Sequence, residues 1–348
     1  MTANNKPFIS IVAPCYNEEA ILELNIRTLI NYLESKSHKY NWEIVIVNDG
    51  SKDNTAAIAN KLADNNTSVR VIHHPTNLNL GTAIKTGFSN SKGEIIIVVD
   101  IDLSYSEQYI ETMVDKLIET SADIVMASPY MKGGKVIAVP FFRRIMSSWV
   151  NRFMSFAAQD KYHTFTGMVR AYRKSFVQTL NLKTRDYEIN PEIIYKAMIL
   201  RAKIIEIPAN LDWTEQNKFA GKRTSSLRVL RSFFSGLMSG FIFRPYIFFI
   251  GIGAILMLLS LYELIWLLYD VLAGLSKSNA IPGAEHSFSH SLAAEFQKNP
   301  QSFLVGGLTF IIAIQFLSVG FLSLQSKRYF EELFHLGTSL KKQKETDL

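Results

Sequence analysis

Short apolar runs alternate with segments of helical periodicity over the first 130 residues. The spacing of apolar residues predicts helices over about 19–35, 54–65 and 81–91. The apolar runs between them are typical of strands, and they read ISIVAP, WEIVIVND, VRVIHH and EIIIVVDID. Because such alternation is typical of a parallel sheet with helices on both faces, we expect an α/β fold. Ligands of these folds bind beyond the carboxyl ends of the strands.

Periodicity weakens after residue 130. The segment 141–157 is apolar with interspersed arginines, which fits equally a helix at a membrane surface or one packed on the sheet. Another helix is expected over 192–201. Apolar residues at helical spacing from Leu227 to Phe241, with Arg228 and Arg231 off that face, predict an interfacial helix.

Two segments are long and apolar enough to span a bilayer. Pro245 to Tyr269 carries one ionisable residue, Glu263, and Phe303 to Leu324 carries none. Each exceeds the roughly 20 residues that a spanning helix needs. Two buried helices of a soluble protein are the alternative, but buried helices of this length are seldom so uniformly apolar. We therefore expect two transmembrane helices.

The distribution of charge predicts the orientation in the membrane. The net charge is +6, and lysines and arginines concentrate between residues 218 and 244 and after Leu324. The loop between the two spans contains only Lys277 and Lys298 as basic residues. The positive-inside rule then places both termini and the N-terminal α/β domain in the cytoplasm, in a multi-pass protein of the cytoplasmic (inner) membrane.

The distribution of basic residues also indicates which kinds of partner the protein binds. Basic residues next to apolar segments favour anionic lipid and argue against nucleic acid. The N-terminus has no signal-peptide pattern, and the single cysteine, Cys15, excludes an intramolecular disulfide. The expected organisation is a catalytic domain (1–220), a juxtamembrane amphipathic helix (221–244), transmembrane helices (245–269 and 303–324), an extracytoplasmic loop (270–302) and a basic tail (325–348).

Asp100 and Asp102 end the fourth apolar run. Residues two apart in a strand point the same way, so both carboxylates are expected to face one spot, where a divalent cation would relieve their repulsion. Mg²⁺ or Mn²⁺ is typically bound by one or two carboxylates together with substrate phosphates. A strand end that merely meets solvent is the alternative.

Two further polar motifs follow predicted strands. Asn48-Asp49-Gly50-Ser51 ends the second, where Asp49 could accept hydrogen bonds from a nucleotide, although these residues also form ordinary turns. Pro14-Cys15-Tyr16-Asn17-Glu18-Glu19 ends the first. Cys15 is interpreted as a small buried residue. The histidines lack a spacing that predicts a metal site.

Together these motifs resemble a known family. PCYNEE, VIVNDGSKDNT, NLNLGTAIKTG and VVDIDLS, followed by SPYMKGGK, TFTGMVRAYRKS, YEINPEIIYKA and IPANLDW, are similar in order and spacing to the GT-A-fold family-2 glycosyltransferases. In particular they resemble the dolichyl-phosphate mannose synthase group and its bacterial polyprenyl-phosphate relatives. The resemblance continues through RTSSLR, the two spans and KRYFEELFHL, and so covers nearly the whole chain.

The resemblance implies a GT-A (Rossmann-like) fold and a role for each matched residue. Pro14, Tyr16, Glu18 and Asp49 would line the nucleotide pocket, and Asp100 and Asp102 would hold the metal and the donor diphosphate. Arg170, Arg223 and Ser225 would meet phosphates of the donor or acceptor, with Glu192 near the acceptor. Asp102, Arg170 and Arg223 are the expected catalytic residues.

This sequence departs from the family pattern at several positions. Asn48 stands where relatives often have a first Asp, and Ser104 where they often have a Gln that contacts the metal. Ser106-Glu107 replaces the common Pro-Glu. Ser128-Pro129-Tyr130 lacks the Arg that commonly precedes the Tyr.

The expected reaction is inverting transfer of a sugar from a UDP- or GDP-linked donor to undecaprenyl or dolichyl phosphate, for cell-envelope or protein glycosylation. A lipid phosphate is already ionised near neutral pH and needs no general base. Transfer to a polysaccharide or other glycan and a non-catalytic scaffold are the alternatives. The sugar, the nucleotide and the lipid stay open, and related two-span enzymes include tetramers, so a homo-oligomer is a further expectation.

Overall fold

The computed structural model describes residues 6–158, 162–214, 244–279 and 287–346. The chain divides into two compact units, which are described separately. The first comprises Met1–Gly240 and Leu333–Leu348, and the second comprises Phe241–Glu332. Most of the expected juxtamembrane helix, together with Arg223 and Ser225, lies outside the described residues.

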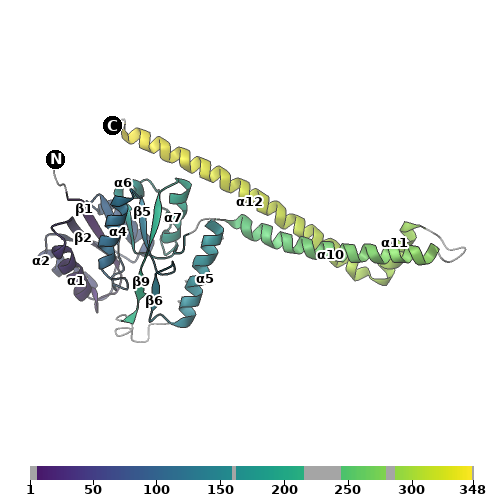
Figure 1. The fold of residues 1–348 in the computed structure, drawn as a ribbon, viewed down its shortest axis with the longest axis horizontal. Helices are drawn as coiled ribbons and strands as arrows, with labels where there is room; N and C mark the ends of the chain where they lie inside the picture. The colour runs from purple at the N-terminus through teal and green to yellow at the C-terminus, as the bar shows by residue number, and fades with distance from the viewer. Residues whose placement is uncertain (1–5, 159–161, 215–243, 280–286, 347–348) are drawn as a thin grey trace. The chain divides into compact units, whose positions relative to one another are not determined.

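The first unit is built on a seven-stranded sheet of order β3-β2-β1-β4-β7-β5-β8 (Figure 1). Its strands are β1 (Phe8–Cys15), β2 (Asn41–Asn48), β3 (Val69–His73), β4 (Ile95–Val98), β5 (Ile124–Ser128), β7 (Arg170–Arg173) and β8 (Ile204–Pro208). Neighbours pair in parallel except β7, which is antiparallel to both β4 and β5. A small second sheet pairs β6 (Lys135–Ile137) with β9 (Asn210–Asp212). The expected α/β fold with a mostly parallel sheet is confirmed.

Helices cover both faces of the large sheet. On one face lie α1 (Leu22–Ser35), α2 (Thr55–Asn65) and α4 (Gln108–Glu119). On the other lie α3 (Leu80–Asn90), α5 (Phe141–Ala158), α6 (Lys174–Val177) and α7 (Ile189–Ile199). The strand period of two distributes side chains between these layers: in β2, Ile44 and Ile46 face the first, whereas Val45 and Val47 face the second.

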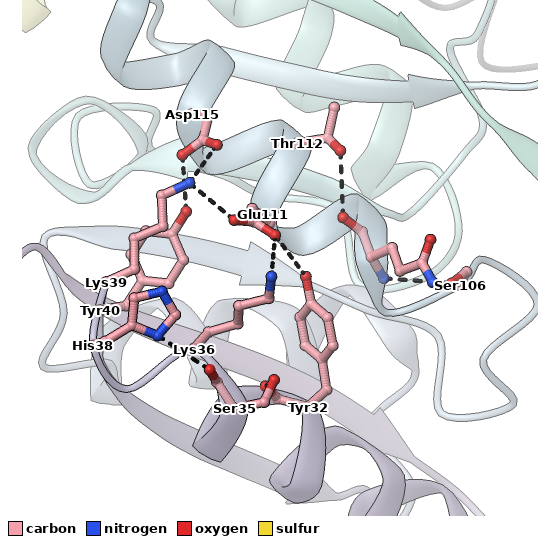
Figure 2. Close-up of polar contacts among 11 residues, drawn as sticks. Tyr32, Ser35, Lys36, His38, Lys39, Tyr40, Ser106, Glu111, Thr112 and Asp115 are labelled. Carbon is pink, nitrogen blue, oxygen red and sulfur yellow. Dashed lines mark hydrogen bonds and ion pairs between the residues drawn. The ribbon is translucent and has the colours of Figure 1, made fainter.

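A charged cluster fastens α4 to the end of α1 and the connection that follows it (Figure 2). Lys39 Nζ lies 2.9 Å from Glu111 Oε1 and 2.6 Å from Asp115 Oδ2, and Lys36 Nζ lies 2.7 Å from Glu111 Oε2. Tyr40 also donates a hydrogen bond to Asp115 (2.8 Å). Lys36 and Lys39 lower the pKa of Glu111 to about 2. The cluster therefore stabilises the packing of α4 while both carboxylates are ionised.

The second unit contains long helices. They are α10 (Pro245–Asn279), α11 (Phe288–Lys298) and the part of α12 (Pro300–Thr346) up to Glu332. Among the described residues, Pro245–Ser276 and Pro300–Leu340 are apolar enough to cross a membrane, and only 11% and 17% of their most apolar windows are buried. This exposure disfavours the alternative of two soluble core helices. Ser260 Oγ donates to Gly306 O (3.0 Å), which joins α10 to α12.

Candidate active site

The carboxyl ends of three adjacent strands, β2, β1 and β4, gather the expected motifs at one edge of the sheet. The backbone N–H of Asp49, just after β2, donates to Cys15 O at the end of β1 (2.9 Å). The backbone N–H of Val99, just after β4, donates to Val12 O (3.0 Å). Asp49 and Asp100 thus follow strands that flank β1, as parallel pairing requires.

Asp100 and Asp102 lie in a turn and not in a strand, because β4 ends at Val98. The expectation that a strand would align their carboxylates is therefore corrected. The turn is closed by hydrogen bonds from Leu103 N to Asp100 O (3.1 Å) and from Ser104 N to Asp102 Oδ1 (2.9 Å). Leu103 adopts a φ of 49°, a conformation that is uncommon for a branched residue. The turn still brings the two carboxylates close enough to interact.

Burial, and then the negative charge of Asp102, raise the pKa of Asp100 to about 8. Two carboxylates that are desolvated and repel each other fit a hard divalent cation, because its positive charge would offset both the desolvation and the repulsion. Within the described residues no group of three or more His, Cys, Asp or Glu side chains could hold a metal. The donor set fits an ion that takes two protein carboxylates and completes its shell with phosphate and water.

The loops after β1 and β2 are joined by hydrogen bonds and form one side of the site. Asn17 N donates to Ser51 Oγ (3.0 Å), Lys52 N to Asn17 Oδ1 (2.8 Å) and Glu18 N to Thr55 Oγ1 (2.8 Å). Between them, Tyr16 is 38% exposed. Pro14 is buried within β1, so its side chain offers no open surface. These hydrogen bonds hold the loop that carries Tyr16 against the turn that follows Asp49.

Gly50 is required at the turn after β2. Its φ is +68°, and a Cβ built there would lie 2.3 Å from Thr76 C. Only glycine combines this φ with so close an approach of the backbone. The segment that follows β3 consequently packs directly against the turn that presents Asp49.

Two consecutive histidines at the end of β3 contact the two polar residues at the end of β2. His73 Nδ1 lies 2.9 Å from Asn48 Nδ2, and Asn48 Oδ1 accepts from Ser51 N (3.2 Å). His74 Nδ1 lies 2.7 Å from Asp49 Oδ1. Asn48 thus stabilises the turn through its hydrogen bonds. Of the two polar residues at the end of β2, Asp49 is the one with an ionisable side chain. These contacts of the two histidines could not be predicted from the sequence, because their partners lie 25 residues away in the chain.

Arg170 does not reach the site surface. It is 1% exposed, and its guanidinium donates to Asn190 O (2.9 Å) and Phe165 O (2.6 Å). In this structure the guanidinium is bonded to backbone carbonyl groups, and its expected contact with a donor or acceptor phosphate stays a prediction. As the residue paired with Val98 in the sheet, it supports the end of β4 from within.

The side chain of Glu192 is likewise buried and bonded to other residues of the domain. It is 3% exposed, forms an ion pair with Lys196 Nζ (2.7 Å) and accepts hydrogen bonds from Lys183 N (2.9 Å) and Thr184 Oγ1 (2.6 Å). Burial acts to raise the pKa of Glu192, but the bonds from Lys196 and Thr184 outweigh it and lower the pKa. The carboxylate shapes the loop before α7, and its expected place near the acceptor stays a prediction.

Helix α5 packs on the sheet by one face and exposes an aromatic face, so a place at a membrane surface stays a prediction. Val150 and Met154 pack in the core, and Asn151 Oδ1 accepts from Phe165 N (2.7 Å). On the opposite face, Phe141 and Trp149 are 74% and 68% exposed. The first face docks the helix on the domain, and the second is the kind of surface that enters a membrane interface.

Arg143, in the first turn of α5, connects this helix to the acidic pair. Its guanidinium stacks on the ring of Trp213 at 4.2 Å, just after β9. Desolvation lowers the pKa of Arg143, and the negative charge of Asp102 is among the effects that oppose this. The guanidinium is therefore a fixed positive charge within electrostatic range of Asp102. The sequence analysis noted the arginines of this segment but assigned them no role.

A groove of about 660 Å³ runs between α5 and the chain around β6. Basic and apolar side chains line it together, including Lys135, Arg144, Ile145, Trp149 and Arg152. A ligand with an anionic head and a hydrocarbon chain matches this combination.

The mostly parallel sheet, with helices on both faces and an acidic turn at its carboxyl edge, is a fold of the GT-A type. More particularly, residues 10–180 match Glycosyl transferase family 2, and the chain carries a domain of that family. It is 30% identical over 203 residues to a dolichol-phosphate mannosyltransferase of Pyrococcus furiosus, covering 58% of this chain and 55% of that relative. It is 28% identical over 218 residues to a dolichyl-phosphate beta-glucosyltransferase of Trichomonas vaginalis, covering 60% and 66%. The chain thus spans less than two thirds of either relative.

A solved structure supports the fold. The glucosyl-3-phosphoglycerate synthase of Mycobacterium tuberculosis, determined with Mn²⁺, uridine diphosphate and phosphoglyceric acid, superposes with a TM-score of 0.50. The match covers 67% of this chain and 78% of that one at 17% identity, which speaks for the shared fold alone.

Proposed function

We propose that this protein transfers a sugar, with inversion, from a nucleoside diphosphate sugar to a polyprenyl phosphate at the cytoplasmic face of a membrane. The observation that carries the proposal is the placement of the groove beside α5, which joins basic and apolar side chains on the helix that also bears Arg143. Relatives named for transfer to dolichyl phosphate support it.

The donor would lie across the edge formed by β1, β2 and β4. Tyr16 and Asp49 would receive the nucleoside, with Glu18 in the same loop, and Asp100 and Asp102 would hold Mg²⁺ or Mn²⁺ on the diphosphate. The cation would neutralise charge on the leaving nucleoside diphosphate.

The acceptor phosphate would lie at the α5 end of the site, where Arg143 is within electrostatic range of Asp102. A guanidinium suits a phosphate because its donors match two phosphate oxygens. The prenyl chain would follow the groove past Ile145 and Trp149 toward the exposed aromatic face of α5. Since the acceptor is already an anion, the protein would act by orienting it and by electrostatics. Arg223 and Ser225 stay predictions for the same phosphate.

The long apolar helices indicate association with a membrane. We propose that both termini are cytoplasmic, as the distribution of basic residues predicts, and that the protein functions in the cytoplasmic membrane, as a monomer or a homo-oligomer such as a tetramer. A product on a lipid phosphate would serve glycosylation of the cell envelope or of proteins.

A transfer assay tests this function. The full chain in detergent is given undecaprenyl or dolichyl phosphate, Mg²⁺ or Mn²⁺ and a panel of nucleotide sugars, and lipid-linked sugar is measured. We expect product from at least one donor, and a loss of at least about 100-fold for Asp102→Asn. Asp115→Asn, the same change in the α1–α4 cluster, should retain activity. Product on a soluble glycan alone, or undiminished product from Asp102→Asn, would overturn the proposal.

A further inference from the structure

Gln315 is an amide side chain near the middle of the second apolar span. The span expected from the sequence runs from Phe303 to Leu324, and Gln315 lies within about 3 Å of its midpoint along the helix axis. The residue is exposed, and within the ranges that the structure describes its amide has no hydrogen-bond partner. Lipid tails offer neither donors nor acceptors, so an inserted α12 would hold an unsatisfied amide where that is most costly.

The face of α12 that contacts α10 is a different one. Gly306, Ala313 and Gly320 are buried at intervals of seven residues along α12. A Cβ built on Gly320 would lie 2.6 Å from Ile250 Cγ1, so the two helices pack closely there. Gln315 follows Ala313 by two residues, which is about 200° around a helix. The amide therefore lies on the side of α12 that is turned away from α10.

Gln315 belongs to a row of exposed residues with a regular spacing. This row, the α12 seam, consists of Leu304, Leu308, Ile311, Gln315, Ser318 and Leu322. Its steps alternate between four and three residues, the heptad pattern through which two helices pack side by side. Leu308 and Ile311 are 63% and 56% exposed. Between residues 303 and 324, all of which the structure describes, the exposed polar residues are Gln315 and Ser318, and both lie on the seam.

We propose that the α12 seam binds the same seam of a second copy of this chain, and that the two Gln315 amides hydrogen-bond to each other across the contact. Copies that insert with one topology present parallel helices, which a two-fold axis along the membrane normal relates. This symmetry places Gln315 opposite itself at the same depth. An amide both donates and accepts, so each Gln315 can donate to Oε1 of the other. Lipid does not offer such a partner.

The inference deepens the proposed homo-oligomer by assigning a surface through which copies associate. It rests on the insertion of α12 in a membrane and not on the proposed reaction. Its tests use neither a nucleotide sugar nor a lipid phosphate. A failure of the transfer assay and a failure of the inference are therefore distinguishable.

Disulfide cross-linking in membranes of the expression host tests the contact. The single cysteine, Cys15, is buried and is first replaced by serine, so that each chain then carries one introduced cysteine. Leu308→Cys and Ile311→Cys lie on the seam and should give a disulfide-linked pair of chains on mild oxidation, because equivalent positions face each other across the axis. Val305→Cys and Phe321→Cys are the matched controls. Both residues are exposed, but they lie about 100° around the helix from the seam.

We expect the two controls to give at least about 5-fold less linked product than the seam positions, since a disulfide needs Cβ atoms about 4 Å apart. Equal cross-linking at all four positions would indicate random collisions of lipid-covered helices and would overturn the inference. The absence of linked product at both seam positions would overturn it as well.

Substitution of the amide tests the role of Gln315. Gln315→Leu removes the hydrogen bonds, and sedimentation equilibrium in density-matched detergent should show a dissociation constant roughly 5- to 100-fold higher, as expected for two interhelical hydrogen bonds. Gln315→Asn can form the same pair of bonds and should stay within about 5-fold of the wild type. Phe321→Leu, away from the seam, should leave the association unchanged. Unchanged association in Gln315→Leu, or an equal loss in Gln315→Asn, would overturn the inference, and the cross-linking decides the contact if Gln315→Leu is not produced.

Discussion

Replacing Asp100 by asparagine should stabilise the metal-free protein while removing its activity. Asparagine has nearly the shape of aspartate but carries no charge. In the turn after β4, burial and Asp102 raise the pKa of Asp100 to about 8, so the ionised form is disfavoured. The neutral amide avoids both the desolvation and the repulsion. The same substitution removes a ligand of the expected cation.

The sign and size follow from proton linkage. The pKa of Asp100 is higher in the folded chain, about 8, than its ordinary value of 3.8. Its ionisation therefore weakens the fold progressively as pH rises from about 4 toward 8. Each tenfold change in proton affinity corresponds to about 1.4 kcal/mol, which bounds the effect at roughly 5 kcal/mol. With Asp100 only partly buried and the turn free to relax, we expect about 1–3 kcal/mol, or a Tm higher by about 3–8 °C at pH 7.5.

Thermal unfolding in detergent, with EDTA or with Mn²⁺, measures this directly. In EDTA, Asp100→Asn should have the higher Tm; in Mn²⁺, the wild type should gain stability and the variant should not. Asp115→Asn is the matched control with the opposite sign, because Asp115 is paired with Lys39 and Tyr40. A Tm for Asp100→Asn in EDTA at or below that of the wild type would refute the reasoning.

Three further outcomes test other parts of the structure. Glu111→Gln should remove stability that is present above the ordinary pKa of 4.5 and lost as pH falls toward about 2, seen as a flatter dependence of Tm on pH below 5. Glu192→Gln leaves Lys196 buried without its ionic partner and should lower the free energy of unfolding by about 3 kcal/mol in urea titrations; an equal loss in Glu192→Gln with Lys196→Met would contradict this. Arg143→Ala should raise the KM for polyprenyl phosphate at least about 10-fold with little change in donor affinity, and an unchanged KM would exclude Arg143 from the acceptor site.

Local patterns predicted most of the sheet and the long helices. The apolar runs of β1 to β4 contain enough β-branched residues to be recognised alone, and the two long helices contain long, strongly apolar segments. The antiparallel strand β7 was not predicted. Its sequence, RAYR, is only four residues long, and the strands that it pairs with, β4 and β5, are distant from it in the chain.

In the candidate site, too, some residues could be placed from the sequence and others could not. Asp49, Asp100 and Asp102 could be placed from the sequence because each follows an apolar strand. Arg170 and Glu192 could not, since a motif does not reveal whether a charged side chain is buried with partners or exposed to a ligand. Burial depends on the packing of elements that are far apart in the chain.

The two faces of α5 have a practical consequence for handling the protein. Phe141, Phe142 and Trp149 stay exposed on the catalytic domain itself, and the opposite face of the helix is tied into its core through Asn151. A shortened protein that ends before Phe241 would lose both long apolar helices but keep this aromatic surface. Because this aromatic surface stays exposed, we expect such a fragment to sediment with liposomes and to aggregate without detergent.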